Sequence, residues 1–320
     1  MQNTELRQTE LRPLGAGELL DRAVTLFVRD FVPIVTVLAV VIVPIIVFQA
    51  IIAPKSGQVF ADFGRVLTSA GDRTASAAAT EALSRHSGST GLSLLLVMIG
   101  IVARLVMWSA VVAVVATAYA GARISFGQAY RIGVQRWLPQ IVVTLAFGAI
   151  AMVTAIPLLI AYVLVAVVIG LLAAVNQFVA AIIFGIIFGL LVLCTIAVVV
   201  SWVFMTYQLA SVAVVTETAN PVEAIGTALR RAFARGMRRR TIIGGLVVFI
   251  VSQVGSLPLL VVAATLTALT HVDVLYFAIV GVGTVLLEGI VAAFVVVYAV
   301  DIRVRREGFD IIAAEPSPVA

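Results

Sequence analysis

The sequence predicts an all-α polytopic membrane protein with about six transmembrane spans and three amphipathic interfacial helices on the cytoplasmic side. Of its 320 residues, 62% are hydrophobic and only 12% are charged, whereas soluble domains are about half apolar and a quarter charged. Apolar runs long enough to cross roughly 30 Å of hydrocarbon recur along the chain. Between them lie segments whose apolar residues recur at helical spacing. We expect one membrane domain covering residues 1–320.

The first expected elements are an interfacial helix at residues 15–31 and a transmembrane span at residues 34–53. The apolar face of this interfacial helix consists of Leu20, Val24, Phe27 and Phe31. Residues 54–90 are rich in Ser, Ala, Gly and Thr and carry charges of both signs, so we expect an extracytoplasmic loop. The second span follows at residues 91–119.

A second interfacial helix is expected at residues 125–138, with an apolar face formed by Phe126, Tyr130, Val134 and Trp137. Residues 140–215 are almost continuously apolar, and Asn176 and Gln177 divide this run near its middle. Two long spans, tilted or broken at Pro157, are the simplest interpretation, and three or four shorter spans remain open.

The third interfacial helix is expected at residues 220–240, with an apolar face formed by Val222, Ile225, Leu229, Phe233 and Met237. The fifth and sixth spans follow at residues 241–269 and 275–300, and residues 302–320 form a cytoplasmic tail. In each interfacial segment, a residue suited to a helix start is followed three positions later by Glu or Gln. These pairs are Gly15 with Glu18, Ser125 with Gln128, and Asn220 with Glu223. A threefold internal repeat would explain them, but six evenly spaced spans give similar spacing without one.

The distribution of basic residues predicts the orientation in the membrane. Sixteen of the 21 basic residues fall on one side of the predicted spans, and the four on the other side are Lys55, Arg65, Arg73 and Arg85. Cytoplasmic loops carry the excess of basic residues, so we expect both termini in the cytoplasm. The basic residues other than Lys55 are arginines, which together with abundant Ala and Val is typical of GC-rich bacterial genes. The expected location is the bacterial cytoplasmic membrane.

Two charged residues, Arg104 and Glu288, are expected near the middle of the second and sixth spans. A charge at the bilayer centre costs about 2.5 to 3.5 kcal/mol on insertion scales, so each should face the bundle interior and seek a partner. The two can pair with each other. Such a pair either belongs to a proton or anion pathway or is a buried ion pair that fixes helix packing.

The segment at residues 220–240 is the most basic part of the chain. Its candidates for contact with anionic lipid are Arg230, Arg231, Arg235, Arg238, Arg239 and Arg240. Anionic headgroups attract surface basic residues by about 1 kcal/mol each. The segment is therefore either an anchor on the inner leaflet or a docking surface for anionic lipid or for a cytoplasmic protein partner.

No catalytic, cofactor or metal site is expected. Cys194 lies alone in an apolar run, and His86 and His271 are isolated. The sequence contains no HExxH, GxSxG, Walker A or dinucleotide-binding motif. Because most arginines flank apolar spans, orientation in the bilayer explains them better than a nucleic-acid partner does.

Three segments, RPLGAGELLDRAVTLFVRDF, AVVTETANPVEAIGTALRRAFARG and YAVDIRVRREGFDI, together resemble a family of bacterial polytopic proteins. This family is named for the membrane domain of glycerophosphoryl diester phosphodiesterases. The resemblance implies a six-span helical bundle linked to the cell envelope or membrane lipid, without the catalytic barrel of the fused members. The positions that match its charged motifs imply a cytoplasmic polar network of Glu18, Asp21, Arg22, Glu217, Asp301, Arg303 and Glu307.

These observations predict a non-enzymatic scaffold, lipid-interacting protein or accessory subunit of the bacterial envelope. Its expected partners are anionic membrane lipids and a protein at the cytoplasmic face. A transporter or permease that uses Arg104 and Glu288 is the alternative, since prolines interrupt several spans. An intramembrane enzyme has the least support because no set of nucleophile and base can be assembled.

Overall fold

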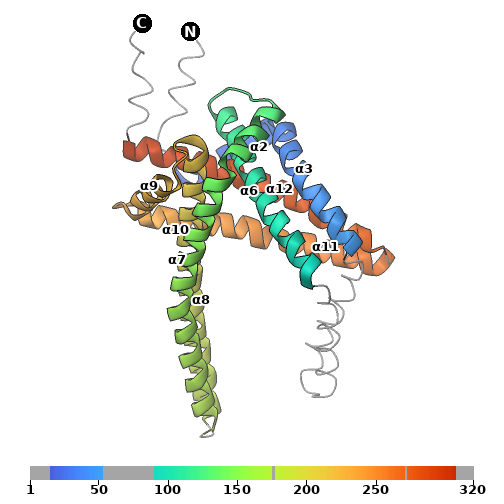
Figure 1. The fold of residues 1–320 in the computed structure, drawn as a ribbon. Helices are drawn as coiled ribbons and strands as arrows, with labels where there is room; N and C mark the ends of the chain where they lie inside the picture. Colours follow the sequence, from blue (N-terminus) through green and yellow to red (C-terminus); the bar gives the residue numbers. More distant parts are fainter. Residues whose placement is uncertain (1–14, 53–89, 175–176, 271, 308–320) are drawn as a thin grey trace. The chain divides into compact units, whose positions relative to one another are not determined.

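A computed structural model describes residues 15–52, 90–174, 177–270 and 272–307. Within these ranges the chain forms helices joined by short turns (Figure 1). In chain order they are α2 (Ala16–Arg29), α3 (Phe31–Ile52), α6 (Thr90–Tyr119), α7 (Phe126–Ala174), α8 (Phe178–Thr216), α9 (Pro221–Phe233), α10 (Met237–Phe249), a π-helical turn (Ile250–Val254), α11 (Gly255–Thr270) and α12 (Asp273–Glu307).

Six stretches of these helices are long and apolar enough to cross a membrane. They are Phe31–Phe48, Met98–Tyr119, Phe126–Leu172, Ile182–Thr216, Met237–Thr270 and Val274–Arg305. The predicted all-α polytopic fold is confirmed, and the protein is an integral, multi-pass membrane protein. Residues 140–215 form two long helices, α7 and α8, and not three or four shorter ones.

The chain divides into two compact units, which are described separately. Unit 1 comprises Met1–Thr25, Gln135–Ile250 and Ala293–Ala320, and unit 2 comprises Leu26–Val134 and Val251–Ala292. The single membrane domain expected from the sequence stays a prediction, and the loop expected at residues 54–90 lies almost wholly outside the described residues.

In unit 2, α3 packs against α6, and glycines bring the first part of α12 close to its neighbours. A β-carbon at Gly281 would collide with the side chain of Ile46 on α3, and one at Gly289 would lie 2.5 Å from the ring of Phe27. Because small residues let membrane helices approach closely, this part of α12 lies directly against the last turn of α2, at Phe27, and against α3.

In unit 1, α8 packs against both α9 and α10. A β-carbon at Gly245 of α10 would collide with the backbone of Ser201 on α8, so these two helices touch main chain to main chain. Helix α7 runs alongside α8 (Figure 1), and the amide of Gln140 donates to the Ser211 hydroxyl at 2.6 Å. The last part of α12 lies against α10, where the Tyr298 ring faces Gly244.

Two predicted start signals have the expected hydrogen bonds. The backbone N–H of Gly15 donates to Glu18 at 2.7 Å. At the start of α7, the Ser125 N–H donates to the Gln128 side chain, and the Gln128 N–H donates back to the Ser125 hydroxyl. Both contacts satisfy donors that a helix start leaves without an intrahelical partner. The threefold repeat stays a prediction.

The helix at the first interfacial segment, α2 (Ala16–Arg29), is buried along one side. Its buried residues are Leu19, Ala23, Leu26 and Phe27, of which only Phe27 belongs to the predicted apolar face. Leu20 and Val24 are 38% and 40% exposed. Helix α2 ends at Arg29, and Phe31 already belongs to α3. An interfacial helix turns its apolar face toward the bilayer, so the predicted apolar face stays a prediction.

The second interfacial segment is not a separate helix. Residues 126–138 are the first part of α7, which continues through Pro139 into the apolar run. A break at Leu138 would have left backbone groups without partners next to the membrane, whereas a proline within a helix removes only its own N–H donor and clashes locally. The predicted boundary at Leu138 was therefore wrong.

The third segment is divided between two helices. Helix α9 ends at Phe233, and Gly236 adopts a left-handed conformation with φ of 81° before α10 begins at Met237. Glycine adopts this conformation without steric cost. Met237 and the three arginines after it thus belong to the next span, so the prediction that they lie in the amphipathic helix was wrong. Helix α12 also extends to Glu307, beyond the predicted start of the tail at residue 302.

Candidate functional site

The candidate site is a network of arginines and carboxylates in unit 1. Its residues come from the end of α8, from α9, from the start of α10 and from the end of α12. The first cluster surrounds Glu217, the residue that follows the last turn of α8. Arg231 of α9 donates from both terminal nitrogens to the two Glu217 oxygens, at 2.8 and 2.9 Å. The Nε of Arg303 on α12 lies 3.9 Å from the same carboxylate. A paired, two-point contact of this kind is the strongest form of ion pair in proteins.

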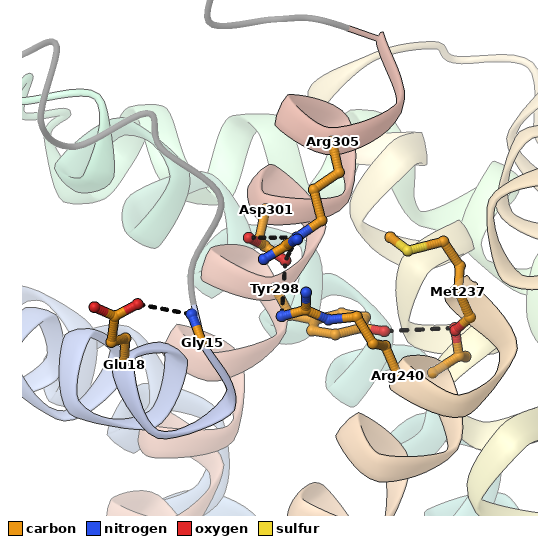
Figure 2. A network of polar contacts seen from close by, with 8 residues as sticks. Gly15, Glu18, Met237, Arg240, Tyr298, Asp301 and Arg305 are labelled. Atoms are coloured by element: carbon orange, nitrogen blue, oxygen red, sulfur yellow. Dashed lines mark hydrogen bonds and ion pairs between the residues drawn. The ribbon is translucent and has the colours of Figure 1, made fainter.

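The second cluster surrounds Asp301 of α12, whose side chain is fully buried. Arg305, one turn later on the same helix, donates from Nε to both carboxylate oxygens at 3.0 and 3.2 Å. Arg240 of α10 approaches from another side, with Nη2 3.6 Å from Asp301 (Figure 2). A buried carboxylate needs such partners because its desolvation is costly.

Tyr298 continues the contact between α12 and α10 (Figure 2). Its hydroxyl donates to the Thr241 hydroxyl at 3.4 Å, and Thr241 donates in turn to the Met237 carbonyl at 3.0 Å. The Tyr298 ring is almost fully buried. This chain of contacts fixes the first turn of α10 against α12.

The polar network inferred from the family resemblance is brought together in part. Glu217, Asp301 and Arg303 take part in the two clusters. Glu18 bonds to Gly15 at the start of α2, and Asp21 is exposed. Arg22 is half-buried. The side chain of Glu307 lies outside the described residues.

Arg231, Arg240 and Arg305 are members of the network that sequence reasoning missed. Asp301 and Arg305 are four residues apart, a spacing that favours an ion pair on one helix, so this pair could have been found from the sequence. Arg231 and Arg240 join acids that are distant along the chain or on another helix, and no local pattern marks them.

The six arginines of residues 220–240 fall into two groups. Arg231 is 7% exposed and bound to Glu217, so the prediction that it contacts lipid was wrong. Arg240 is 25% exposed and reaches Asp301. The exposed members are Arg230, Arg235, Arg238 and Arg239. The first group is explained by the fold, and the second group is not.

Arg104 and Glu288 lie together in unit 2, as expected, with Nη2 of Arg104 4.0 Å from the Glu288 carboxylate. The Arg104 side chain is 58% exposed and that of Glu288 is 28% exposed. The expectation that Arg104 faces the interior was therefore wrong for the chain described here.

A further ion cluster in unit 2 was not anticipated. Asp30, in the turn between α2 and α3, is 4% exposed and accepts from the Arg29 Nε at 2.8 Å. Arg29 also donates to the Ala118 carbonyl near the end of α6, and Arg123 lies 3.9 Å from Asp30. These contacts hold the turn between α2 and α3 against the end of α6.

The described helices also form two apolar grooves. One, of about 430 Å³, lies between α3 and α12 in unit 2, and the other, of about 340 Å³, lies between α7 and α8 in unit 1. Val43 and Val282 line the first, and Ala151 and Val203 line the second. Walls of this composition suit hydrocarbon and not a polar solute.

Comparison of the chain with known protein families, curated proteins and solved structures finds no match.

Proposed function

We propose that this protein is a non-enzymatic, lipid-interacting scaffold or accessory subunit of the bacterial cytoplasmic membrane. The observation that carries the proposal is the pairing of the buried carboxylates with arginines. Glu217 and Asp301 are held by arginines from neighbouring helices, in contacts that fix α8, α9, α10 and α12 together. Carboxylates and arginines paired in this way are suited to holding helices in a fixed arrangement.

The apolar exterior supports the lipid-interacting part of the proposal. Large apolar side chains are exposed along α7 and α8, among them Leu145, Val153, Leu159 and Leu190. In a bilayer these side chains contact acyl chains. The two apolar grooves extend this contact between neighbouring helices.

The proposed topology places both termini in the cytoplasm. An even number of spans returns the chain to the side on which it began, and the arginine excess marks that side as cytoplasmic. An alkaline phosphatase fusion after Gly71 is expected to be active and one after Arg240 inactive. The reverse result would overturn the orientation.

We also propose membership of the glycerophosphoryl diester phosphodiesterase membrane-domain family, on the three segments quoted above. The full-length protein, purified in a mild detergent, is expected to retain anionic phospholipid and to copurify with a protein partner bound at its cytoplasmic face. Mass spectrometry of the complex tests both. Purification without retained lipid and without a partner would contradict the proposal.

The ion pair of Arg104 and Glu288 favours a transporter as the second candidate. Charged residues within spans mark ion and substrate pathways in many membrane proteins. If the pair carries a transported proton or anion, Glu288→Gln should abolish flux in proteoliposomes while the protein remains folded. If the pair only fixes helix packing, Glu288→Gln should lower thermal stability, and the wild type should show no flux.

A further inference from the structure

The exposed arginines beside the turn between α9 and α10 form no ion pair in the part of the chain that the structure describes. Arg235 precedes Gly236, and Arg238 and Arg239 follow it in the first turn of α10. All three are exposed, and the described residues place no carboxylate within ion-pair distance of them. Arg231 and Arg240, by contrast, are held by acids from α8 and α12. The fold therefore neutralises two of the six arginines of this segment and leaves three of the four exposed ones beside the turn for an external anion.

The arginine at position 238 is held in a defined orientation. Its guanidinium carbon lies 5.6 Å from the centre of the Phe233 ring, and its Nε is 3.3 Å from the Phe233 carbonyl. The same ring packs edge-on against Trp202 of α8, with the two ring centres 4.7 Å apart. Nε is thus directed back toward α9, and the two terminal nitrogens remain for another partner. A planar guanidinium held this way matches the oxygens of a phosphate.

The depth of the turn identifies the source of that phosphate. Met237, the residue after Gly236, begins a stretch that is apolar enough to cross the membrane. On the other side of the turn, Phe233 is 49% exposed and Val222, at the start of α9, is 71% exposed. Exposed apolar groups on a surface helix insert into the boundary between headgroups and acyl chains. Arginines at the junction between such a helix and the first turn of a span lie at the level of the lipid phosphates.

We propose that Arg238, supported by Arg235 and Arg239, binds the phosphate of anionic membrane lipids at the turn between α9 and α10. This inference deepens the proposed function and rests on it, because it names the lipid class and the residues that bind it. The stack of Trp202, Phe233 and Arg238 positions the arginine, and its two neighbours add charge. Replacement of Arg238 by lysine keeps the charge but removes the two-point contact.

The test uses the full-length protein in a neutral detergent, titrated with short-chain phosphatidylglycerol or phosphatidylcholine and followed by native mass spectrometry. The wild type should prefer phosphatidylglycerol. Arg235→Gln with Arg238→Gln should weaken phosphatidylglycerol binding about 25-fold, since each arginine contributes about fivefold at a lipid surface. The matched control is Arg131→Gln with Arg136→Gln, which removes the same charge from α7 and should leave binding unchanged. Arg238→Lys should give an intermediate loss.

Several results would overturn the inference. An equal loss in both double variants would indicate a general charge effect, and no loss in either would remove the site. Displacement of the lipid by millimolar inorganic phosphate would indicate a soluble anion. Preference for a polyglutamate peptide over phosphatidylglycerol would indicate an acidic protein segment. Gel filtration and circular dichroism of each variant monitor folding, and if the double glutamine variant does not fold, Arg238→Lys alone decides. Failure of the proposed function is a different result: the wild type would then retain neither lipid nor a partner protein.

Discussion

Arg231 and Glu217 lie 14 residues apart in the chain and form a two-point ion pair that joins α9 to the end of α8. The neighbouring Arg230 has the same charge and lies on the same helix, but it is exposed and contacts only the Thr227 side chain among the described residues. Two adjacent arginines therefore have opposite roles. One holds the fold together, and the other faces outward.

This difference predicts the first mutational result. Arg231→Gln should destabilise the protein by about 3 to 5 kcal/mol, because it leaves the partly buried Glu217 carboxylate without its main partner. Arg230→Gln should change stability by less than about 0.5 kcal/mol. Thermal unfolding of both variants in the same detergent measures the difference. Equal melting temperatures would contradict a structural role for the pair.

Asp301 gives a second prediction. Asp301→Asn should lower the unfolding free energy by several kcal/mol, since it removes the charge that Arg240 and Arg305 share at a fully buried position. Asp21→Asn, at an exposed position, is the matched control and should be close to neutral. Protease sensitivity of α10 reports the local loosening. If Asp301→Asn unfolds no earlier than the control, the cluster does not hold α10 to α12.

The turn at Gly236 gives a third prediction. Gly236→Ala should destabilise the protein by about 1 kcal/mol or more, because φ of 81° is strained for a residue with a β-carbon. Gly226→Ala within α9 should instead stabilise by about 0.5 to 1 kcal/mol, because it replaces glycine in a helix and its β-carbon would meet nothing within 4 Å. In chemical denaturation, the unfolding midpoints of the two variants should therefore shift in opposite directions from that of the wild type.

The contact between α8 and α10 gives a fourth prediction. Gly245→Ala places a methyl group against the Ser201 backbone, which cannot move without shifting the whole helix. We expect a loss of about 1 to 3 kcal/mol, typical of overpacking. Gly148→Ala on α7 has open space around it and should cost little. If Gly245→Ala were as stable as the wild type, α8 and α10 would separate more easily than their close contact suggests.

The sequence predicted the helical class and the membrane spans well, because long apolar runs are a strong signal. It predicted the boundary between α2 and α3 closely, and the division of residues 140–215 into two helices. It misplaced the ends at Leu138 and near Gly236. At Leu138 the membrane environment favours an unbroken helix over the polarity of the local sequence. At Gly236 the glycine that allows the turn lies inside an otherwise continuous amphipathic pattern.

The site was harder to predict than the fold. Glu217, Asp301 and Arg303 were identified through family resemblance and not through their spacing. Their arginine partners on α9 and α10 depend on how helices pack, which no local pattern specifies. Arg231 shows the difficulty most clearly, because it is buried although it belongs to a run of basic residues whose exposed members suit lipid contact.

The lengths of α7 and α8 have a consequence for the membrane itself. Residues 141–174 of α7 and all of α8 contain no charged side chain, and at 1.5 Å per residue these stretches measure about 51 and 58 Å. Because the whole bilayer with its headgroup layers is only about 40 to 45 Å thick, either the helix axes lean by more than about 25° or the lipids around them stretch. Both cost energy that depends on acyl-chain length. The protein is therefore expected to accumulate in the thickest regions of its bilayer and to melt at a higher temperature as the lipid chains around it are lengthened.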